Sequence, residues 1–394
     1  MAPSEHTPGD VASRIQTSLA GTPYAVSSLE TLAGGLSNFT YHAALTRGLE
    51  DGSTDVLVKH GEAYMAKFPE NPITTDRCDV EAACLKELAA VEVCSDESST
   101  ANFTVRAPKC YHYDFSTKTQ VQEYLPHVVT LKTHCMKTLQ TPAGENAQHD
   151  YRLLGKSLAE YIQRAHVLMA RAMGAHAGEE SKAHDATTLR QVITSNSEMQ
   201  KLVHTINYDW LMERVNQFPE TLSDAKDVFI QVKEQALGEI QGGCGSLSVI
   251  NGDFGPHNVL ISDAPVEAGC ETCLFVVDWE NAQFGVEGMD HGYMLGELYS
   301  IWLKGADVAL WMLQGYAEGL GSMPEGTALR IALQTGIYLV SLSTAIPGWS
   351  SSAQVEDVAR RGRDIIVNAW NKDRAWFDGG ELSCLFRDVT SDRS

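Results

Sequence analysis

The chain has 394 residues, and its 51 Asp and Glu outnumber its 30 Lys and Arg, which gives a formal net charge of −21. This length suits two lobes or one large domain and excludes a disulfide-stapled miniprotein. The acidic balance argues against nucleic-acid and membrane partners, because binding to either polyanion relies on basic patches. A hydrophobic fraction of 43% predicts a globular core rather than a disordered chain.

No targeting or membrane segment is recognisable. The first residues have no basic region followed by an apolar run, and no stretch reaches the roughly 18 apolar residues that a membrane span needs. We therefore expect a cytoplasmic protein. The nine cysteines are an odd number without regular spacing, so reduced thiols are expected. Cys270 and Cys273 have CxxC spacing, but no second ligand pair completes a tetrahedral zinc site.

Strand-like runs and tight turns dominate the first third of the chain. Residues 1–26 are polar and small, and we expect a short helix or an arm there. Three strand-like runs between 27 and 62 predict an antiparallel meander. Apolar residues at helical spacing in 75–93 predict a helix that has its charged side chains on the opposite face. Two further strand-like segments within 105–126 complete this β-rich unit.

The rest of the chain is expected to be mostly helical. Helical spacing of apolar residues predicts helices at 153–173, 208–218 and 224–240 and a long helical stretch from about 290 to 376. Two short apolar strands interrupt this region, at 246–253 and 273–280. A small β-rich lobe followed by a larger helical lobe is the organisation that these patterns predict.

Polar residues with the chemistry for phosphoryl transfer follow these two strands. Asp253 comes directly after the first strand, Asn258 follows five residues later, and the second strand ends in Asp278-Trp279-Glu280. In phosphoryl transfer one carboxylate accepts or orients the hydroxyl proton, while an amide oxygen and another carboxylate hold Mg²⁺ against the nucleotide phosphates. Asp and Asn are also frequent turn residues after strands, which is the structural alternative.

Two upstream features suit a nucleotide site. The turn 33–38 (AGGLSN) lies between strand-like runs, and its small residues would let backbone N–H groups approach phosphate oxygens; a plain hairpin turn explains it as well. Strand alternation places Lys59 opposite the apolar Val56, as a buried or cleft-facing amine, with an edge lysine in water as the alternative. Its candidate partner is Glu81, with Glu87 as the competing carboxylate.

The segment Asn251-Gly252-Asp253 with Asn258, followed by Asp278-Trp279-Glu280, resembles the catalytic and metal-binding motifs of the aminoglycoside phosphotransferase and choline kinase superfamily. The Asp-Trp-Glu form and the Gly-Gly-Leu-Ser-Asn turn are most similar to the methylthioribose kinase and fungal hydroxytryptamine kinase group. The resemblance implies an α+β, bilobal protein-kinase-like fold. Its expected parts are an N-terminal arm or helix (1–26), a small β-rich N-lobe with one main helix (27–126) and a larger, mostly helical C-lobe (127–394).

The same resemblance implies a role for each candidate residue. Asp253 would be the catalytic base, and Asn258, Asp278 and Glu280 would be the metal ligands. The residues implied in nucleotide binding are Gly34, Gly35, Ser37 and Asn38 in the turn, the pair Lys59 and Glu81, and Glu123, Tyr124 and Leu125 in a hinge whose backbone would read the adenine edge. Asp290 would brace the catalytic loop, and His166 would end one of the family's helices.

We therefore expect an ATP- and Mg²⁺-dependent small-molecule kinase that transfers the γ-phosphate to a hydroxyl of a small, amine-bearing metabolite or antibiotic-like acceptor. The chain lacks His-Arg-Asp, an Asp-Phe-Gly before an activation segment, and Ala-Pro-Glu, which protein kinases carry. Asn251 stands where the superfamily has His, so a catalytically impaired pseudokinase that binds nucleotide or a partner is the alternative. A metal-dependent hydrolase is less favoured, because it would need further His ligands.

The acidic residues are concentrated near the expected metal site. Residues 234–303 contain eleven Asp and Glu and no Lys or Arg. Four of these acids already have expected roles in catalysis, metal binding or bracing, and the remainder would favour Mg²⁺ and a cationic acceptor. The sequence leaves open the identity of the acceptor, the position phosphorylated, the oligomeric state and the preference for ATP over GTP.

Overall fold

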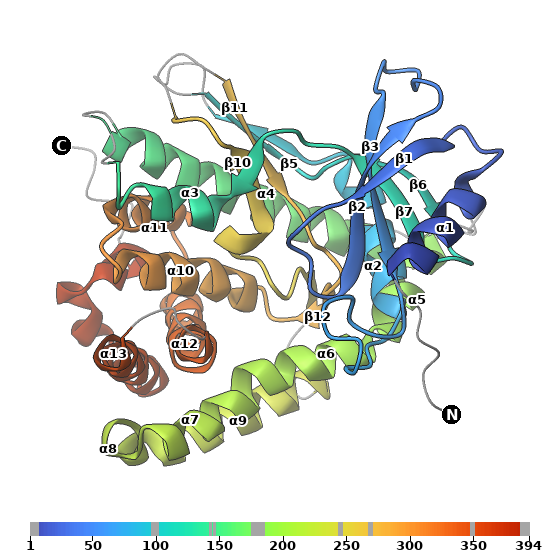
Figure 1. Cartoon of the computed structure of the whole chain (residues 1–394). Helices are drawn as coiled ribbons and strands as arrows, with labels where there is room; N and C mark the ends of the chain where they lie inside the picture. The colour runs from blue at the N-terminus through green and yellow to red at the C-terminus, as the bar shows by residue number, and fades with distance from the viewer. Residues whose placement is uncertain are drawn as a thin grey trace.

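The computed structural model describes residues 8–95, 102–141, 144, 147–174, 186–242, 247–266, 271–346 and 351–386 (Figure 1). The first sheet is antiparallel and has five strands in the order β1-β2-β3-β7-β6. These strands are β1 (Val26–Thr31), β2 (Asn38–Leu45), β3 (Asp55–Gly61), β6 (Cys110–Asp114) and β7 (Thr119–Glu123). The pairing of β1 with β2 and of β2 with β3 confirms the predicted meander.

Alternation along β3 separates the two faces of this sheet. Val56 and Val58 are fully buried and belong to the apolar cluster that α1 (Pro8–Leu19) completes. Lys59 is out of phase with them and points to the opposite face, where α2 (Asp76–Leu88) lies. The leading helix is therefore confirmed over the described residues, and the direction expected for Lys59 is confirmed as well.

Helix α2 is shorter than predicted, and its charged side chains do not all lie on an outer face. It ends at Leu88, and β4 (Glu92–Cys94) replaces the end of the predicted helix 75–93. The buried charged residues of α2 are Arg77, Asp79 and Glu81. The expectation of an outer charged face was wrong because each of these side chains has an oppositely charged partner, which compensates the cost of burial.

A second five-stranded sheet combines strands from distant parts of the chain. Its order is β4-β5-β11-β10-β8. The strands that join β4 are β5 (Asn102–Arg106), β8 (Val128–Thr130), β10 (Val259–Ser262) and β11 (Glu271–Val276). Because β5 pairs in parallel with β11, part of the expected N-terminal β unit lies beside the strand that leads to Asp278. The division of the chain at residue 126 remains a prediction.

The other described residues are mainly helical. The helices are α3 (Leu131–Lys137), α4 (Ala147–Gly174), α5 (Ala186–Ser195), α6 (Ser197–His204), α7 (Trp210–Gln217), α8 (Pro219–Leu222), α9 (Lys226–Ile240), α10 (Gly288–Trp302), α11 (Asp307–Leu320), α12 (Glu325–Ser341) and α13 (Ser352–Trp370). Two short strands, β9 (Ser248–Ile250) and β12 (Gln283–Gly285), form an antiparallel pair. The predicted helices at 153–173, 208–218 and 224–240 correspond to α4, α7 and α9, whereas α5 and α6 were not predicted.

The helical stretch expected from 290 to 376 is divided among α10, α11, α12 and α13. Gly305 and Gly321 follow the ends of α10 and α11 with φ angles of 99° and 71°. This left-handed conformation ends helices and suits glycine, which has no Cβ to clash. Pro324 then precedes α12. The apolar spacing predicted the helical content of this stretch but not its breaks, which divide it into a packed group of helices.

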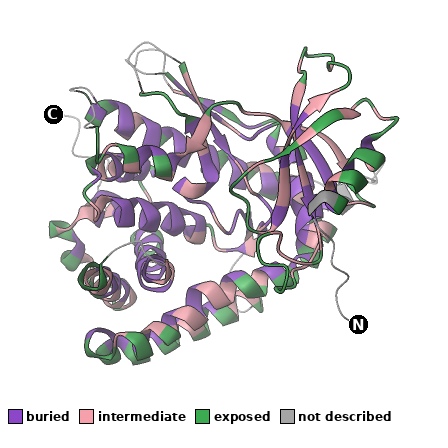
Figure 2. Cartoon of the chain, viewed as in Figure 1, coloured by how far each residue is buried: buried purple, intermediate pink, exposed green. Residues whose placement is uncertain are grey.

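The main core lies where α4, α10, α11 and α12 meet, and buried residues dominate these helices in Figure 2. Gly155 of α4 and Gly315 of α11 allow the two backbones to approach closely, because a Cβ at either position would collide with the backbone of the other helix. The predicted α+β class, with a β-rich N-terminal part and a helical C-terminal part, is confirmed. Among the described helices, none is long and apolar enough to cross a membrane.

Candidate active site

The loop that carries Asp253 connects β9 to β10 and is anchored by one buried carboxylate. Asp290 of α10 is fully buried, and its two oxygens accept the backbone N–H groups of Asn251 and Gly252, each at 2.8 Å. His166 Nε2 of α4 lies 2.8 Å from Asp290 Oδ2. Gly252 has a φ of 81°, and a Cβ there would collide with the Asn281 carbonyl. Asp290 therefore braces the loop as predicted, and His166 supports the same carboxylate.

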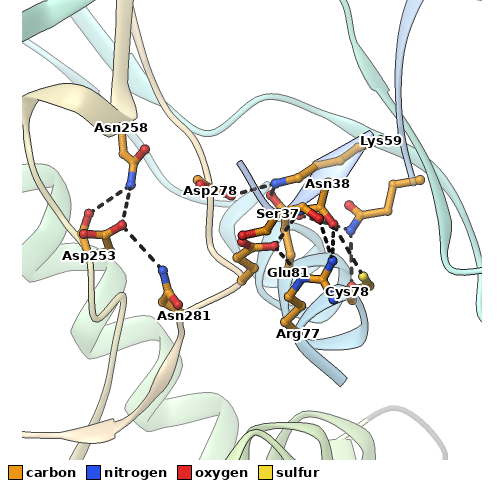
Figure 3. A network of polar contacts seen from close by, with 12 residues as sticks. Ser37, Asn38, Lys59, Arg77, Cys78, Glu81, Asp253, Asn258, Asp278 and Asn281 are labelled. Carbon is orange, nitrogen blue, oxygen red and sulfur yellow. Dashed lines mark hydrogen bonds and ion pairs between the residues drawn. The ribbon is translucent and has the colours of Figure 1, made fainter. Parts of the chain in front are cut away.

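Asp253 lies at the surface of the site with its carboxylate held by amides. Asn258 Nδ2 donates to Asp253 Oδ2 at 3.2 Å and to its carbonyl at 3.1 Å, and Asn281 Nδ2 donates to the same Oδ2 at 3.5 Å (Figure 3). The Asp253 side chain is 28% exposed. A carboxylate that is oriented by donors and open to solvent can accept the proton of an incoming hydroxyl.

Lys59 joins two carboxylates that lie far apart in the sequence, Glu81 and Asp278. Its Nζ lies 2.8 Å from Glu81 Oε1 and 2.6 Å from Asp278 Oδ1 (Figure 3). The Lys59 side chain is 14% exposed, so it is a largely buried lysine paired with Glu81 and not an edge lysine in water. Burial alone would lower the pKa of Lys59, but the Asp278 and Glu81 carboxylates hold it well above its usual value.

Three carboxylates around Lys59 form a candidate metal site. Ligand oxygens of Glu81, Asp278 and Glu280 lie within 4.8 Å of one another, and oxygen donors are the ligands that Mg²⁺ prefers. Burial raises the pKa of Glu81 to about 7, against the lowering effect of Lys59. Asp278 has a positive φ of 62°, an uncommon conformation for a residue with a side chain. The predicted ligands Asp278 and Glu280 fit a divalent cation, and Glu81, which pairs with Lys59, lies beside them.

The third predicted metal ligand, Asn258, is turned toward the proposed base. Its Nδ2 donates to the carbonyl and to the carboxylate of Asp253. The Asn258 amide therefore contacts the candidate base, whereas the candidate metal site is formed around Glu81 and its neighbours. Asn258 is 8% exposed and lies directly before β10, which pairs with the strand that ends near Asp278. Its role as a metal ligand remains a prediction.

Glu280 is held by two residues of the N-terminal sheet region. Asn38 Nδ2 donates to Glu280 Oε2 at 2.5 Å, and Arg77 Nε lies 3.3 Å from the same oxygen. The fully buried Arg77 also donates to Asn38 Oδ1 at 2.9 Å and to the Ser37 carbonyl at 3.0 Å. Burial and the neighbouring Asp278 raise the pKa of Glu280. The end of the predicted phosphate turn is therefore tied directly to the candidate metal site.

The glycines of this turn occupy the connection between β1 and β2. Gly34 has a φ of 138°, a conformation that residues with a Cβ rarely adopt. A Cβ on Gly35 would lie 3.2 Å from the Asn38 carbonyl, which is a tight contact. Both positions suit a turn that brings backbone close to a ligand. Phosphate binding by Gly34, Gly35, Ser37 and Asn38 remains a prediction.

The predicted hinge begins at the end of β7. Glu123 forms two hydrogen bonds with the Arg106 guanidinium, at 2.6 and 2.7 Å. Tyr124 stacks on His42 with ring centroids 4.2 Å apart, and the next residue, Leu125, is half-buried. Two of these side chains are thus engaged in protein contacts, which agrees with an expected role through the backbone. Nucleotide contact at the hinge remains a prediction.

Sequence reasoning missed a row of charges behind Asp253. His257 Nδ1 lies 2.6 Å from Glu297 Oε2, and its Nε2 lies 3.3 Å from Asp253 Oδ1. Lys132 Nζ lies 2.8 Å from the other Glu297 oxygen. Burial alone would lower the pKa of His257, but Glu297 and Asp253 hold it well above its usual value. Glu297 follows Asp290 by seven residues, two helical turns, and this spacing was the available signal that both face the loop.

Several other acids of the 234–303 cluster have partners of their own. The contacts are Glu239 with Arg330, Asp263 with Lys137, Glu271 with Thr104, and Glu287 with Ser248. Glu267 lies outside the described residues, as does Cys270 of the CxxC pair. The ion pairs of Glu239 and Asp263 weaken the charge argument for a cationic acceptor, because a carboxylate paired with a cation adds little potential at Asp253.

Comparisons with known proteins match nearly the whole chain. It is 28% identical over 391 residues to a phosphotransferase, FrzJ, of Cladobotryum sp, covering 95% of this chain and 96% of that protein. It is 22% identical to the 4-hydroxytryptamine kinase of Psilocybe cyanescens, covering 92% and 91% of the two chains. No model of a protein family matches. These relatives are phosphotransferases and kinases, which confirms the predicted likeness to the fungal hydroxytryptamine kinase group and the predicted enzyme class, a phosphotransferase.

Solved structures of kinases align over most of the chain at low identity. The choline kinase of Cryptosporidium parvum Iowa II is 11% identical, with 97% of this chain and all of that chain covered and a TM-score of 0.43. An aminoglycoside phosphotransferase in complex with ADP and hygromycin B is 13% identical, with 91% and 98% covered and a TM-score of 0.41.

Proposed function

We propose that this chain is an ATP-dependent kinase that phosphorylates a hydroxyl of a small molecule in the cytoplasm. The observation that supports the proposal is that Asn251 connects two polar groups. One is Asp253 with its amide donors, and the other is Lys59 with its carboxylate partners. Asn251 Oδ1 accepts the Asp253 N–H at 3.0 Å, and its Nδ2 donates to the Asp278 carbonyl at 3.5 Å. Phosphoryl transfer needs this combination of a base, a cation and oxygen ligands.

Each group has a distinct task in the proposed reaction. Lys59 would bind the α- and β-phosphates of ATP, with Glu81 holding its ammonium in place. Asp278 and Glu280, with Asn258, would hold Mg²⁺, which when bound neutralises charge on the phosphate oxygens. The Asp253 carboxylate would accept a hydrogen bond from the acceptor hydroxyl and take its proton as the new O–P bond forms. The bond between the γ-phosphorus and the oxygen that bridges it to the β-phosphate would break in the same transfer, with ADP as the leaving group.

For the acceptor we propose a small hydroxylated aromatic compound that carries an amine. The similarity to two 4-hydroxytryptamine kinases, over more than nine-tenths of this chain, supports this class. The acidic site supports the amine only in part, because several of the acids outside the metal site are paired. We therefore expect the aromatic hydroxyl to be the stricter requirement and the amine the looser one.

The alternative of an impaired pseudokinase depends on Asn251, which replaces the expected His. Asn251 is fully buried, its N–H is held by Asp290, and its side chain bridges the loops of Asp253 and Asp278. A His at this position would be expected to scaffold the loop through the same kind of hydrogen bonds. The substitution therefore gives no reason to expect loss of turnover.

The test is Mg²⁺-dependent release of ADP from ATP with 4-hydroxytryptamine and a panel of phenols and amine-bearing alcohols. We expect acceptor-stimulated turnover with a phosphorylated product detected by ³¹P NMR, and a loss of at least about 100-fold in kcat for Asp253→Ala. Asp227→Ala, at an exposed position of α9, is the matched control and keeps wild-type turnover. Nucleotide binding without turnover above the Asp253→Ala level for any acceptor would favour the pseudokinase.

A further inference from the structure

His257 lies between two carboxylates at the base of the candidate site. Its Nδ1 is 2.6 Å from Glu297 Oε2, and its Nε2 is 3.3 Å from Asp253 Oδ1. Its backbone N–H donates to the same Glu297 oxygen at 3.2 Å. The two ring nitrogens of His257 therefore face one carboxylate each, and the ring bridges Glu297 and Asp253.

The surroundings hold this bridge in one place. The Glu297 side chain is 2% exposed, and Lys132 Nζ lies 2.8 Å from its second oxygen. Gly255 leaves the space that Glu297 needs, because a Cβ there would lie 2.7 Å from Glu297 Oε2 and 2.9 Å from His257 Nδ1. Basic and acidic side chains alternate along the row Lys132, Glu297, His257 and Asp253, and each one contacts the next.

The two oxygens of Asp253 receive different donors. Oδ2 accepts from Asn258 and Asn281, while Oδ1 faces His257. Donors on both oxygens restrict rotation of the carboxylate, which without His257 would be held on one side only. Side-chain exposures of 31% for His257 and 28% for Asp253 leave both groups partly open to solvent, where an acceptor can approach.

We propose that His257 is a positioning residue for the reaction, which orients the Asp253 carboxylate toward the acceptor hydroxyl while Glu297 and Lys132 hold the imidazole in place. This inference rests on the proposed kinase function. Orientation of a reacting group affects the chemical step more than substrate binding, and small misplacements cost large factors in rate. Removal of the imidazole should therefore lower kcat and leave the KM for ATP nearly unchanged.

The experiment measures ADP release from Mg²⁺·ATP with the best acceptor of the panel, for the wild type and for His257→Ala. We expect a fall in kcat of about 10- to 100-fold with a KM for ATP within about twofold of the wild-type value. Free imidazole should restore part of kcat in His257→Ala, because it can occupy the vacated position. His149→Ala removes an exposed histidine and should show neither loss nor rescue.

Two results would overturn the inference. One is a folded His257→Ala enzyme with wild-type kcat, and the other is a loss of kcat that imidazole does not restore and that follows the loss of thermal stability. If His257→Ala does not fold, Glu297→Gln is the second variant, because Gln keeps the shape of the side chain that holds His257. It should lower kcat without changing the KM for ATP, and an unchanged kcat in this variant would also overturn the inference. A wild-type chain without turnover rejects the kinase function itself, and the role of His257 with it.

Discussion

Lys59 Nζ lies 2.6 Å from Asp278 Oδ1, although 219 residues separate the two in the chain. The ion pair connects the central strand region of the first sheet to the segment that follows β11. Lys59 and its hydrogen bond lower the pKa of Asp278, against the raising effect of burial. The lysine therefore neutralises carboxylates that would otherwise repel one another, which is the task that Mg²⁺ would share in the proposed enzyme.

Replacing this lysine should make the protein dependent on the metal for stability. Lys59→Met leaves Glu81, Asp278 and Glu280 within 4.8 Å of one another without the ammonium, and we expect a loss of about 3 kcal/mol in the free energy of unfolding. Addition of Mg²⁺ should recover part of the lost stability, and removal of Mg²⁺ with EDTA should abolish this gain. Thermal unfolding with and without Mg²⁺ measures both effects.

Lys67→Met is the control, because Lys67 is an exposed lysine of the same region. Its unfolding temperature should respond to Mg²⁺ as the wild type does. If Lys59→Met and the wild type gain equally from Mg²⁺, the three carboxylates do not form a site whose charge Lys59 compensates.

The contacts that were predicted from sequence depend on local regularity. Alternation along β3 set the direction of Lys59, and Glu81 lies on the next helix, so two local patterns sufficed for this pair. Asp290 was recognised because it belongs to a motif. In each case a local sequence pattern or a motif was sufficient for the prediction.

The contacts that were missed join distant segments that carry no shared pattern. Asn38 and Glu280 are 242 residues apart, and Lys132 and Glu297 are 165 apart. The burial of Arg77 also could not be inferred from helical spacing, because a charged residue is assigned to the outer face unless its partner is known. Pairing of β5 with β11 depends likewise on the assembled sheet and not on either strand alone.

Asp290 provides a test of the catalytic-loop brace. In Asp290→Asn one of the two acceptor oxygens becomes an NH₂ group, which faces a buried backbone N–H of Asn251 or Gly252 and cannot accept from it. We expect a loss of about 3 kcal/mol in the free energy of unfolding and a lower kcat, because the Asp253 loop loses an anchor. Urea unfolding measures the first effect and ADP release the second.

Asp307→Asn, at an exposed position in the first turn of α11, is the matched control and should change stability by less than about 0.5 kcal/mol. An Asp290→Asn protein as stable as this control would mean that the two N–H contacts do not anchor the loop.

His291 should make the protein less stable as the pH falls. Burial, with a smaller contribution from His166, lowers the pKa of His291 to about 3, and its Nδ1 lies 2.8 Å from the Tyr316 hydroxyl. The unfolded chain binds a proton on this residue below about pH 6.5, whereas the folded chain does not until about pH 3. Titration of His291 therefore leaves the free energy of unfolding unchanged above about pH 6.5 and lowers it as the pH falls from there toward 3.

The measurement compares urea unfolding of the wild type and His291→Gln at pH 8 and pH 5. Gln keeps a hydrogen-bonding group near Tyr316 but does not titrate, so the stability advantage of the wild type should shrink by about 2 kcal/mol between the two pH values. Glu81, with a pKa raised by burial to about 7, titrates in both proteins, and its effect cancels in the difference. His149→Gln, at an exposed position, should show no such change; a constant difference for His291→Gln would contradict the lowered pKa.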